Sequence, residues 1–136
     1  MLRYSYLLTL HFFILFISET QAQREFEFVE DGVTYHMKEY FVVFLKKGPN
    51  REEIDPKVAE ELQTKHLEYL GNLYNEGKIV INGPFGDDGE LRGMSFYSVE
   101  SLEEATRLAT GDPMVKAGWL AVEVHPWFGA KGSTLK

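Results

Sequence analysis

Residues 62–85 read LQTKHLEYLGNLYNEGKIVINGPF and decide the fold that the rest of the sequence predicts. The stretch begins as an amphipathic helix, is stopped by Gly77, and continues as a short apolar strand. Within the helix, Leu62 and Leu70 lie four residues before and after His66, and a helix stacks such positions on one face. The imidazole of His66 is therefore predicted to face the interior of the domain.

The first 22 residues have the pattern of a secretory signal peptide. A basic start at Arg3 precedes an apolar run over residues 7–17, and Thr20-Gln21-Ala22 supplies the small residues favoured at a cleavage site. The run is shorter than the roughly 20 residues of a membrane-spanning helix, which argues against the alternative of a membrane anchor. We therefore predict a signal peptide over residues 1–22 and an exported, periplasmic or secreted protein without a stable membrane anchor.

The composition fits one acidic domain. The chain has 14 basic and 21 acidic residues and a formal net charge of −7. This balance argues against a nucleic-acid partner, because such binding needs a concentrated basic surface. The chain has no cysteine, so neither disulfides nor a lipid-modified cysteine are expected. Stability must come from packing or from oligomerisation.

The hydrophobic pattern predicts a clear order of elements. Alternating residues on both sides of Asp31-Gly32 predict a β-hairpin arm over residues 23–38, since this dipeptide accepts positive φ. The domain that follows is predicted to contain a central strand over 39–46, a helix over 56–76, strands over 78–82 and 91–99, a helix over 101–110, and a strand over 116–125. Gly83-Pro84 is predicted to turn the chain and Pro126-Trp127 to end the last strand, with a flexible tail over 129–136.

Apart from the arm, this order is the split β-α-β-β-α-β arrangement of an α+β, ferredoxin-like fold. Both helices then cover one face of a single antiparallel sheet and leave the other face open. Apolar residues expected on the open face, such as Phe96 and Trp119, need a cover. A second copy of the sheet supplies one, so we predict a homodimer.

Four short motifs occur together along the predicted domain: His66-Leu67-x-Tyr69-Leu70, Gly83-Pro84, Asp112-Pro113 and Pro126-Trp127. With Leu91-Arg92-Gly93 at the start of the third strand, the sequence resembles the YCII-related family of dimeric α/β barrels over about residues 39–128. Members of that family resemble small-aromatic enzymes of the muconolactone isomerase and dehydrochlorinase type. The resemblance implies the ferredoxin-like fold and a histidine–aspartate catalytic pair, which falls here on His66 and Asp112.

His66 is the strongest candidate for a catalytic group. A neutral imidazole accepts a proton near neutral pH, which makes histidine the commonest general base. The structural alternative is a buried histidine whose ring N–H is satisfied by a carbonyl. Asp112 would fix the tautomer of His66 and stabilise the imidazolium, as the orienting aspartate does in a catalytic triad. Its alternative role is an ordinary N-cap for a helical turn that starts at Pro113.

Five further residues are candidates for substrate binding: Gly83, Pro84, Arg92, Tyr40 and Trp127. Gly83 would let a ligand approach the backbone closely, and Arg92 would bind an anionic group. The two aromatic rings, together with Phe44, would line a pocket that suits aromatic ligands. A turn, a surface arginine and core packing are the respective structural alternatives.

The sequence predicts neither a metal nor a cofactor. His36, His66 and His125 lack metal-ligand spacing, and no phosphate loop, nucleophile elbow or dinucleotide fingerprint occurs. Two hypotheses follow. The first is a cofactor-free lyase or isomerase in which a His–Asp pair moves a proton on a small hydroxylated or aromatic molecule. The alternative is a non-catalytic dimeric module that binds a small ligand or serves a structural role.

Overall fold

The computed structural model describes residues 24–136, so the predicted signal peptide lies outside the described residues. The elements in chain order are β1 (Glu25–Glu30), β2 (Val33–Lys47), the 3-10 turn η1 (Arg51–Glu53), α1 (Pro56–Asn75), β3 (Ile79–Pro84), β4 (Leu91–Tyr97), α2 (Leu102–Thr110), α3 (Pro113–Lys116) and β5 (Leu120–Ala130). Between residues 24 and 136, no helix is long and apolar enough to span a membrane.

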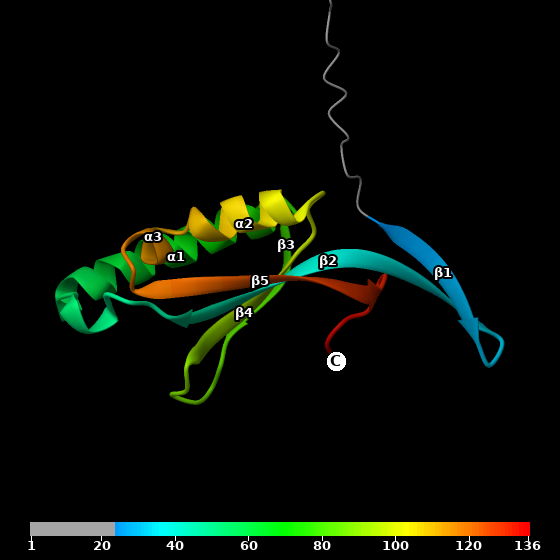
Figure 1. Cartoon of the computed structure of the whole chain (residues 1–136), viewed down its shortest axis with the longest axis horizontal. Coiled ribbons are helices and arrows are strands. Elements are labelled where there is room, and N and C mark those ends of the chain that lie inside the picture. The colour runs from blue at the N-terminus through cyan, green and yellow to red at the C-terminus, as the bar shows by residue number, and fades with distance from the viewer. Residues whose placement is uncertain (1–23) are drawn as a thin grey trace, which may run out of the picture.

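One five-stranded antiparallel sheet is the centre of the fold (Figure 1). Its strands pair in the order β1-β2-β4-β3, and β5 pairs with the opposite edge of β2. The helices α1, α2 and α3 all lie on one face of this sheet. The α+β, ferredoxin-like architecture predicted from the order of elements is therefore confirmed.

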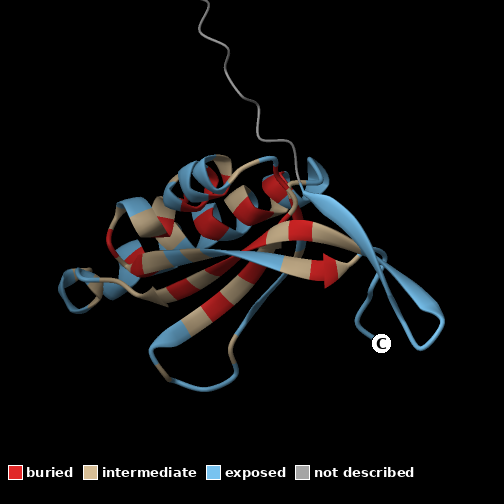
Figure 2. Cartoon of the chain, turned by 45° about the vertical axis from the view of Figure 1, so that its right-hand side comes forward, coloured by how far each residue is buried: buried red, intermediate tan, exposed pale blue. Residues whose placement is uncertain are grey.

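The core lies between these helices and the inner face of the sheet. Phe41, Val43 and Leu45 alternate along β2 and are buried in the core. The register of β5 places Val124 opposite Val43 and Val122 opposite Leu45, so both valines pack against the same core, as predicted. In Figure 2 the buried residues gather where the helices and the sheet meet.

Local signals fix the two ends of α1. The Asp55 side chain accepts a hydrogen bond from the backbone N–H of Lys57 at 2.8 Å, and Pro56 occupies the first helical position. Gly77 ends the helix at φ 72°, a conformation that favours glycine. The buried face of the helix carries Ala59, His66, Leu70 and Leu73, so His66 faces the interior as predicted.

β1 and the first part of β2 form a hairpin arm that extends away from the body of the domain (Figure 1). Asp31 at φ 49° and Gly32 at φ 76° make its tight turn. The second strand of the arm does not end at residue 38 as predicted, because β2 continues unbroken into the centre of the sheet. Arg24 hydrogen-bonds Glu39 where the arm joins the sheet, and this bond holds the pKa of the Glu39 carboxyl below its ordinary value.

Two predictions about where strands end were wrong, and each involves a proline. Gly83 and Pro84 belong to β3 rather than to a turn, and β5 continues through Pro126 as far as Ala130. β3 and β5 form edges of the sheet. A proline is tolerated in an edge strand, because its missing N–H can face the side without a neighbouring strand.

The start of β5 also differs from the prediction. The helical turn α3 and a reversal at Gly118, with φ 77°, delay the strand until Leu120 instead of residue 116. Trp119 therefore precedes the strand and packs against the core, not on the open face. The predicted tail begins two residues too early, since Gly129 and Ala130 still pair with β2.

The outer face of the sheet carries aromatic side chains and is not covered by any helix of the described part of the chain. Phe96 lies here as predicted, with its ring centroid 5.0 Å from that of Trp127. Tyr40 is 6.1 Å from Trp127, and Phe44 contacts the ring of His125. Trp127 is 46% exposed, so this face carries exposed apolar surface.

Candidate functional site

A cavity of about 600 Å³ lies between α1 and the inner face of β3 and β4. The side of the cavity formed by α1 is lined by Gln63, His66, Leu67, Leu70, Gly71 and Tyr74. The strands contribute Asn82, Gly83, Pro84, Arg92, Gly93 and Ser95. Leu67 and Tyr74 are more than half exposed, so the cavity opens to solvent along this edge of α1.

Small residues on β4 make room for this cavity. Gly93 and Ser95 occupy the positions of β4 that face the helices, opposite Leu45 and Val43 of β2. The next inward position, Tyr97, is large and fully buried, and its burial raises the pKa of its hydroxyl. The inner face of the sheet is therefore filled at one end and hollow at the other.

His66 and Asp112 meet at the inner wall of the cavity. His66 Nδ1 lies 2.6 Å from Asp112 Oδ2, and both residues are buried, at 7% and 2% exposure. With Asp112 as a carboxylate, which can only accept, this contact requires the proton on Nδ1 as the donor. The hydrogen bond joins residues 46 positions apart in the sequence.

The geometry leaves the second ring nitrogen of His66 to the cavity. Nε2 has no hydrogen-bond partner among residues 24–136. Every fully buried side-chain nitrogen or oxygen in that range does have a partner, so Nε2 is not fully buried. Nε2 therefore reaches the cavity that His66 lines. A neutral imidazole with its proton on Nδ1 presents Nε2 as a proton acceptor.

Asp112 has both of the roles that the sequence left open. Its Oδ1 accepts the backbone N–H of Met114 at 2.8 Å, which caps α3 in the same way that Asp55 caps α1. Its Oδ2 accepts from His66. Each carboxylate oxygen is thus committed to one partner, and the cap fixes the direction in which the other oxygen points.

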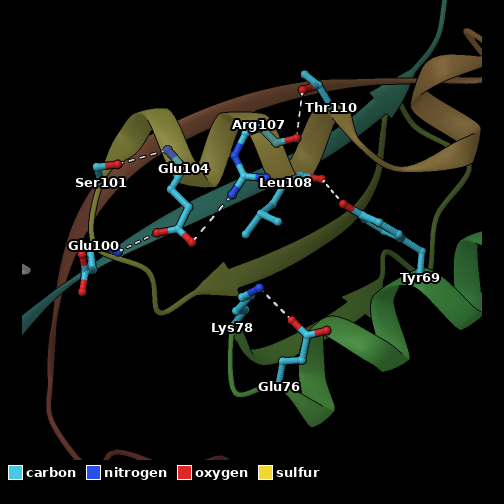
Figure 3. Close-up of polar contacts among 9 residues, drawn as sticks. All are labelled: Tyr69, Glu76, Lys78, Glu100, Ser101, Glu104, Arg107, Leu108 and Thr110. Carbon is cyan, nitrogen blue, oxygen red and sulfur yellow. Dashed lines mark hydrogen bonds and ion pairs between the residues drawn. The ribbon is translucent and has the colours of Figure 1, made fainter.

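Tyr69 joins the two helices beside this pair. Its hydroxyl donates to the backbone carbonyl of Leu108 at 2.8 Å, which ties the end of α2 to α1 one turn after His66 (Figure 3). Burial raises the pKa of Tyr69, and the negative charge of Asp112 adds to this effect. The chain then passes through Gly111, where a Cβ would lie 2.5 Å from the Tyr69 hydroxyl oxygen. A glycine at this position lets the chain turn closely past Tyr69 and bring Asp112 to His66.

The structure brings some of the predicted binding residues together and separates others. Gly83, Pro84 and Arg92 line the cavity that contains His66. Tyr40 and Trp127 lie opposite each other in the register of β2 and β5, on the outer face of the sheet. The next residue of β2, Phe41, points to the inner face and belongs to the core. They do not line this cavity, because neighbouring residues of a strand point to opposite faces, and the role of Tyr40 and Trp127 in substrate binding stays a prediction.

Most residues that line the cavity were not singled out as site residues from the sequence, and two of them, Arg51 and Trp119, carry large polar or aromatic side chains. Arg51 and Trp119 lie together at one end of the cavity, with the Arg51 guanidinium 4.4 Å from the centroid of the Trp119 ring. Arg51 comes from the turn before α1, and Trp119 from the reversal before β5. Residues in such connections have no periodicity that would predict which way they face. Asn82 and Ser95, by contrast, follow the strand alternation and could have been found from it.

No group of three or more His, Cys, Asp or Glu side chains that could hold a metal ion occurs within residues 24–136. The donor set at the cavity is one imidazole backed by one carboxylate. Such a set can accept and return a proton and stabilise the resulting imidazolium. Its chemistry is that of a general base with an orienting partner.

The fold is similar to that of a solved protein structure. A solved structure of 5-chloro-2-hydroxyhydroquinone dehydrochlorinase (TftG) from Burkholderia phenoliruptrix AC1100, in complex with 2,5-dihydroxybenzoquinone, is similar to the chain with a TM-score of 0.51. It is 26% identical in sequence, and the match covers 65% of this chain and 92% of that one.

Two sequence comparisons give a relative and a family. The uncharacterized protein YjpA of Bacillus subtilis (strain 168) is 31% identical over 71 residues, which cover 52% of this chain and 81% of the relative. The model of the YCII-related domain matches residues 40–128, close to the range over which the motifs suggested the resemblance. The chain therefore belongs to the YCII-related domain family.

Proposed function

We propose that this protein is a cofactor-free lyase or isomerase in which His66 moves a proton on a small hydroxylated, ring-shaped molecule. The observation that supports the proposal most strongly is the 2.6 Å hydrogen bond between His66 Nδ1 and Asp112 Oδ2 at the wall of a cavity. Nε2 would take a proton from a hydroxyl group or a ring carbon. Asp112 would hold the tautomer and stabilise the imidazolium until the proton is returned.

The dimensions of the site and the similar solved structure support this class of substrate. A volume of about 600 Å³ lies within the usual range for small-molecule sites, roughly 300–1,000 Å³. The similar dehydrochlorinase was solved with 2,5-dihydroxybenzoquinone, a planar oxygenated ring. A single acid/base group contributes about 10²- to 10⁴-fold in rate, so the substrate must already be activated, as polyhydroxylated rings and unsaturated lactones are.

The alternative of a non-catalytic module makes a different demand on His66. A module needs no base at the cavity and allows the imidazole to be sealed in the core. In this chain Asp112 occupies only Nδ1, and His66 lines the cavity. That arrangement is what proton transfer requires, and it favours an enzyme over a scaffold.

Proton exchange in deuterated water tests the proposed function without knowledge of the natural reaction. The protein is incubated with 2-hydroxyhydroquinone under argon, and loss of its ring proton signals is followed by NMR. We expect exchange to be faster with the protein than in buffer, and chloride to be released from the 5-chloro derivative. If neither ligand shows exchange or chloride release above the buffer rate, the proton-transfer proposal is contradicted for this class of ring.

We also propose that the protein is a homodimer formed through the outer face of the sheet. This face exposes Trp127 and carries Phe96 and Phe44, an aromatic surface of the kind that marks an interface.

Phe96→Glu would bury a charge in that interface. Light scattering after size exclusion should give twice the chain mass for the wild type and the single chain mass for this variant. Leu102→Glu, at an exposed apolar position of α2, is the control and should remain dimeric. A monomeric wild type, or a dimeric Phe96→Glu, would contradict this interface.

The exported location remains our proposal, based on the sequence of residues 1–22. Its support is the basic start, the short apolar run and the small residues before Gln23. The protein should be recovered outside the cytoplasm of the cells that express it. Its intact mass, measured by mass spectrometry, should correspond to a chain that begins at Gln23. Recovery of the full-length chain in the cytoplasm alone would contradict export.

A further inference from the structure

The lining of the cavity is positively charged although the protein is acidic. The chain has a formal net charge of −7, with 21 acidic residues. Among the described residues that line the cavity there are two arginines, Arg51 and Arg92, and no aspartate or glutamate. The nearby carboxylates of Asp112 and Asp88 lie behind His66 and Arg92 and are not among the lining residues, so a ligand in the cavity meets cationic side chains.

Arg92 holds the loop after β3 with one end of its guanidinium and leaves another edge free. Its Nη1 donates to the backbone carbonyls of Asp87 and Gly89 at 3.1 and 3.3 Å, and to Asp88 Oδ1 at 3.1 Å. Nε and Nη2 have no partner among residues 24–136. These two donors form the side-on fork that binds a carboxylate-like group through two parallel hydrogen bonds.

Arg51 is positioned by stacking rather than by an acidic partner. Its guanidinium lies 4.4 Å from the centroid of the Trp119 ring, and both residues line the cavity. The N–H groups of the guanidinium have no hydrogen-bond partner or ion pair in the described part of the chain. The contact with Trp119 holds the guanidinium at the cavity and leaves its donors available to a ligand.

We infer that the cavity selects a small planar ring that carries a delocalised negative oxygen group, either a carboxylate or the equivalent anion of a hydroxyquinone. Arg51 and Arg92 bind the anionic group, and His66 acts on the ring. The assignment of the ring to His66 rests on the proposed function; the preference for an anion rests on the arginines alone. Charge-assisted hydrogen bonds are roughly twice as strong as neutral ones, which makes them the main source of selectivity in such a site.

The test compares matched ligands that differ in charge. The affinities of 2,5-dihydroxybenzoate and of neutral 2,5-dihydroxybenzamide are measured by calorimetry for the mature protein, which begins at Gln23. We expect the wild type to prefer the anion by about tenfold or more. The preference should fall to within about threefold in Arg51→Gln/Arg92→Gln, where both charges are lost but both side chains can still donate hydrogen bonds.

A control variant and a second pair of ligands complete the binding experiment. Arg107→Gln removes an arginine of α2 that lies outside this cavity, and it should keep the full preference. The pair 2,5-dihydroxybenzoquinone and neutral 2,5-dimethoxybenzoquinone repeats the comparison without a carboxylate, and it shows which of the two anionic groups the site prefers. If the double variant does not fold, Arg51→Gln and Arg92→Lys are measured singly, and each should lower the preference.

The inference is overturned if neither anion binds, if the benzamide binds as tightly as the benzoate, or if the preference survives in both arginine variants. Its failure can be told apart from failure of the proposed function. Proton exchange on 2-hydroxyhydroquinone that depends on His66 but shows no charge preference would remove only the anionic selectivity. Tight, arginine-dependent binding of the benzoate without any proton exchange would contradict only the proposed enzymatic function.

Discussion

Replacing His66 with glutamine is expected to slow proton exchange on 2-hydroxyhydroquinone by about 10²- to 10⁴-fold, the contribution of one positioned general base. Glutamine is close to histidine in size, and its amide can still donate to Asp112, so the fold should be retained. It cannot accept a proton near neutral pH, and only Nε2 of His66 supplies that function in the cavity. The exchange rate measured by NMR at saturating ligand gives the effect directly.

The control for this substitution is His125→Gln. His125 is exposed on the outer face of the sheet, where it contacts Glu123, and it should be dispensable for exchange. Thermal unfolding of both variants shows that neither effect arises from loss of fold. An exchange rate in His66→Gln equal to that of the wild type would exclude His66 as the base.

Replacing Asp112 with alanine should lower the free energy of unfolding by about 2–5 kcal/mol, the sum of a lost helix cap and a buried imidazole N–H left without its acceptor. Asp112 is 2% exposed and accepts hydrogen bonds from both Met114 and His66, so water cannot replace the missing oxygens easily. Chemical denaturation of the variant and the wild type measures the difference.

The chain provides its own control for this prediction. Asp55 caps α1 through the same Asp-Pro motif, with a 2.8 Å bond to the N–H of Lys57, but it is exposed and has no histidine partner. Asp55→Ala should therefore cost only about 1 kcal/mol. Equal losses in the two alanine variants would mean that Asp112 acts only as a cap.

Asp112→Asn separates the structural role from the functional one. An asparagine oxygen can keep the cap on Met114, but the amide then presents N–H groups to His66 and favours the wrong tautomer. The unfolding free energy should change less than in Asp112→Ala, whereas proton exchange should fall about as far as it does in His66→Gln. Normal exchange in Asp112→Asn would show that His66 needs no orienting carboxylate.

Most of the fold could be predicted from the sequence because its helix and turn signals are local. Asp55-Pro56 and Gly77 bracket α1, and Asp31-Gly32 adopts the positive φ angles of a tight hairpin. Two of the errors, at Gly83-Pro84 and at Pro126-Trp127, have one physical cause in common. A proline was taken to end a strand, but β3 and β5 are edge strands, and whether a strand lies at an edge depends on pairing with residues far away in the sequence.

The site was predictable in part. The family resemblance indicated His66 and Asp112, and the sequence pattern alone showed only that His66 faces inward. That the end of α2 returns Asp112 to α1 depends on the Tyr69–Leu108 contact and on the small residue at Gly111, which no local pattern reveals. Tyr40 and Trp127, which were candidates for substrate binding, lie on the face of the sheet opposite the cavity, because one position along a strand changes the side on which a residue lies.

The protonation of the His66 ring tests the central claim most directly. A long-range ¹⁵N–¹H correlation spectrum of the labelled protein distinguishes the two neutral tautomers, before and after 2,5-dihydroxybenzoquinone is added. We predict a proton on Nδ1, held by Asp112, and an unprotonated Nε2 whose signal moves when the ligand binds. A proton on Nε2 in the free protein, or an Nε2 signal that is unchanged by a bound ligand, would contradict the account.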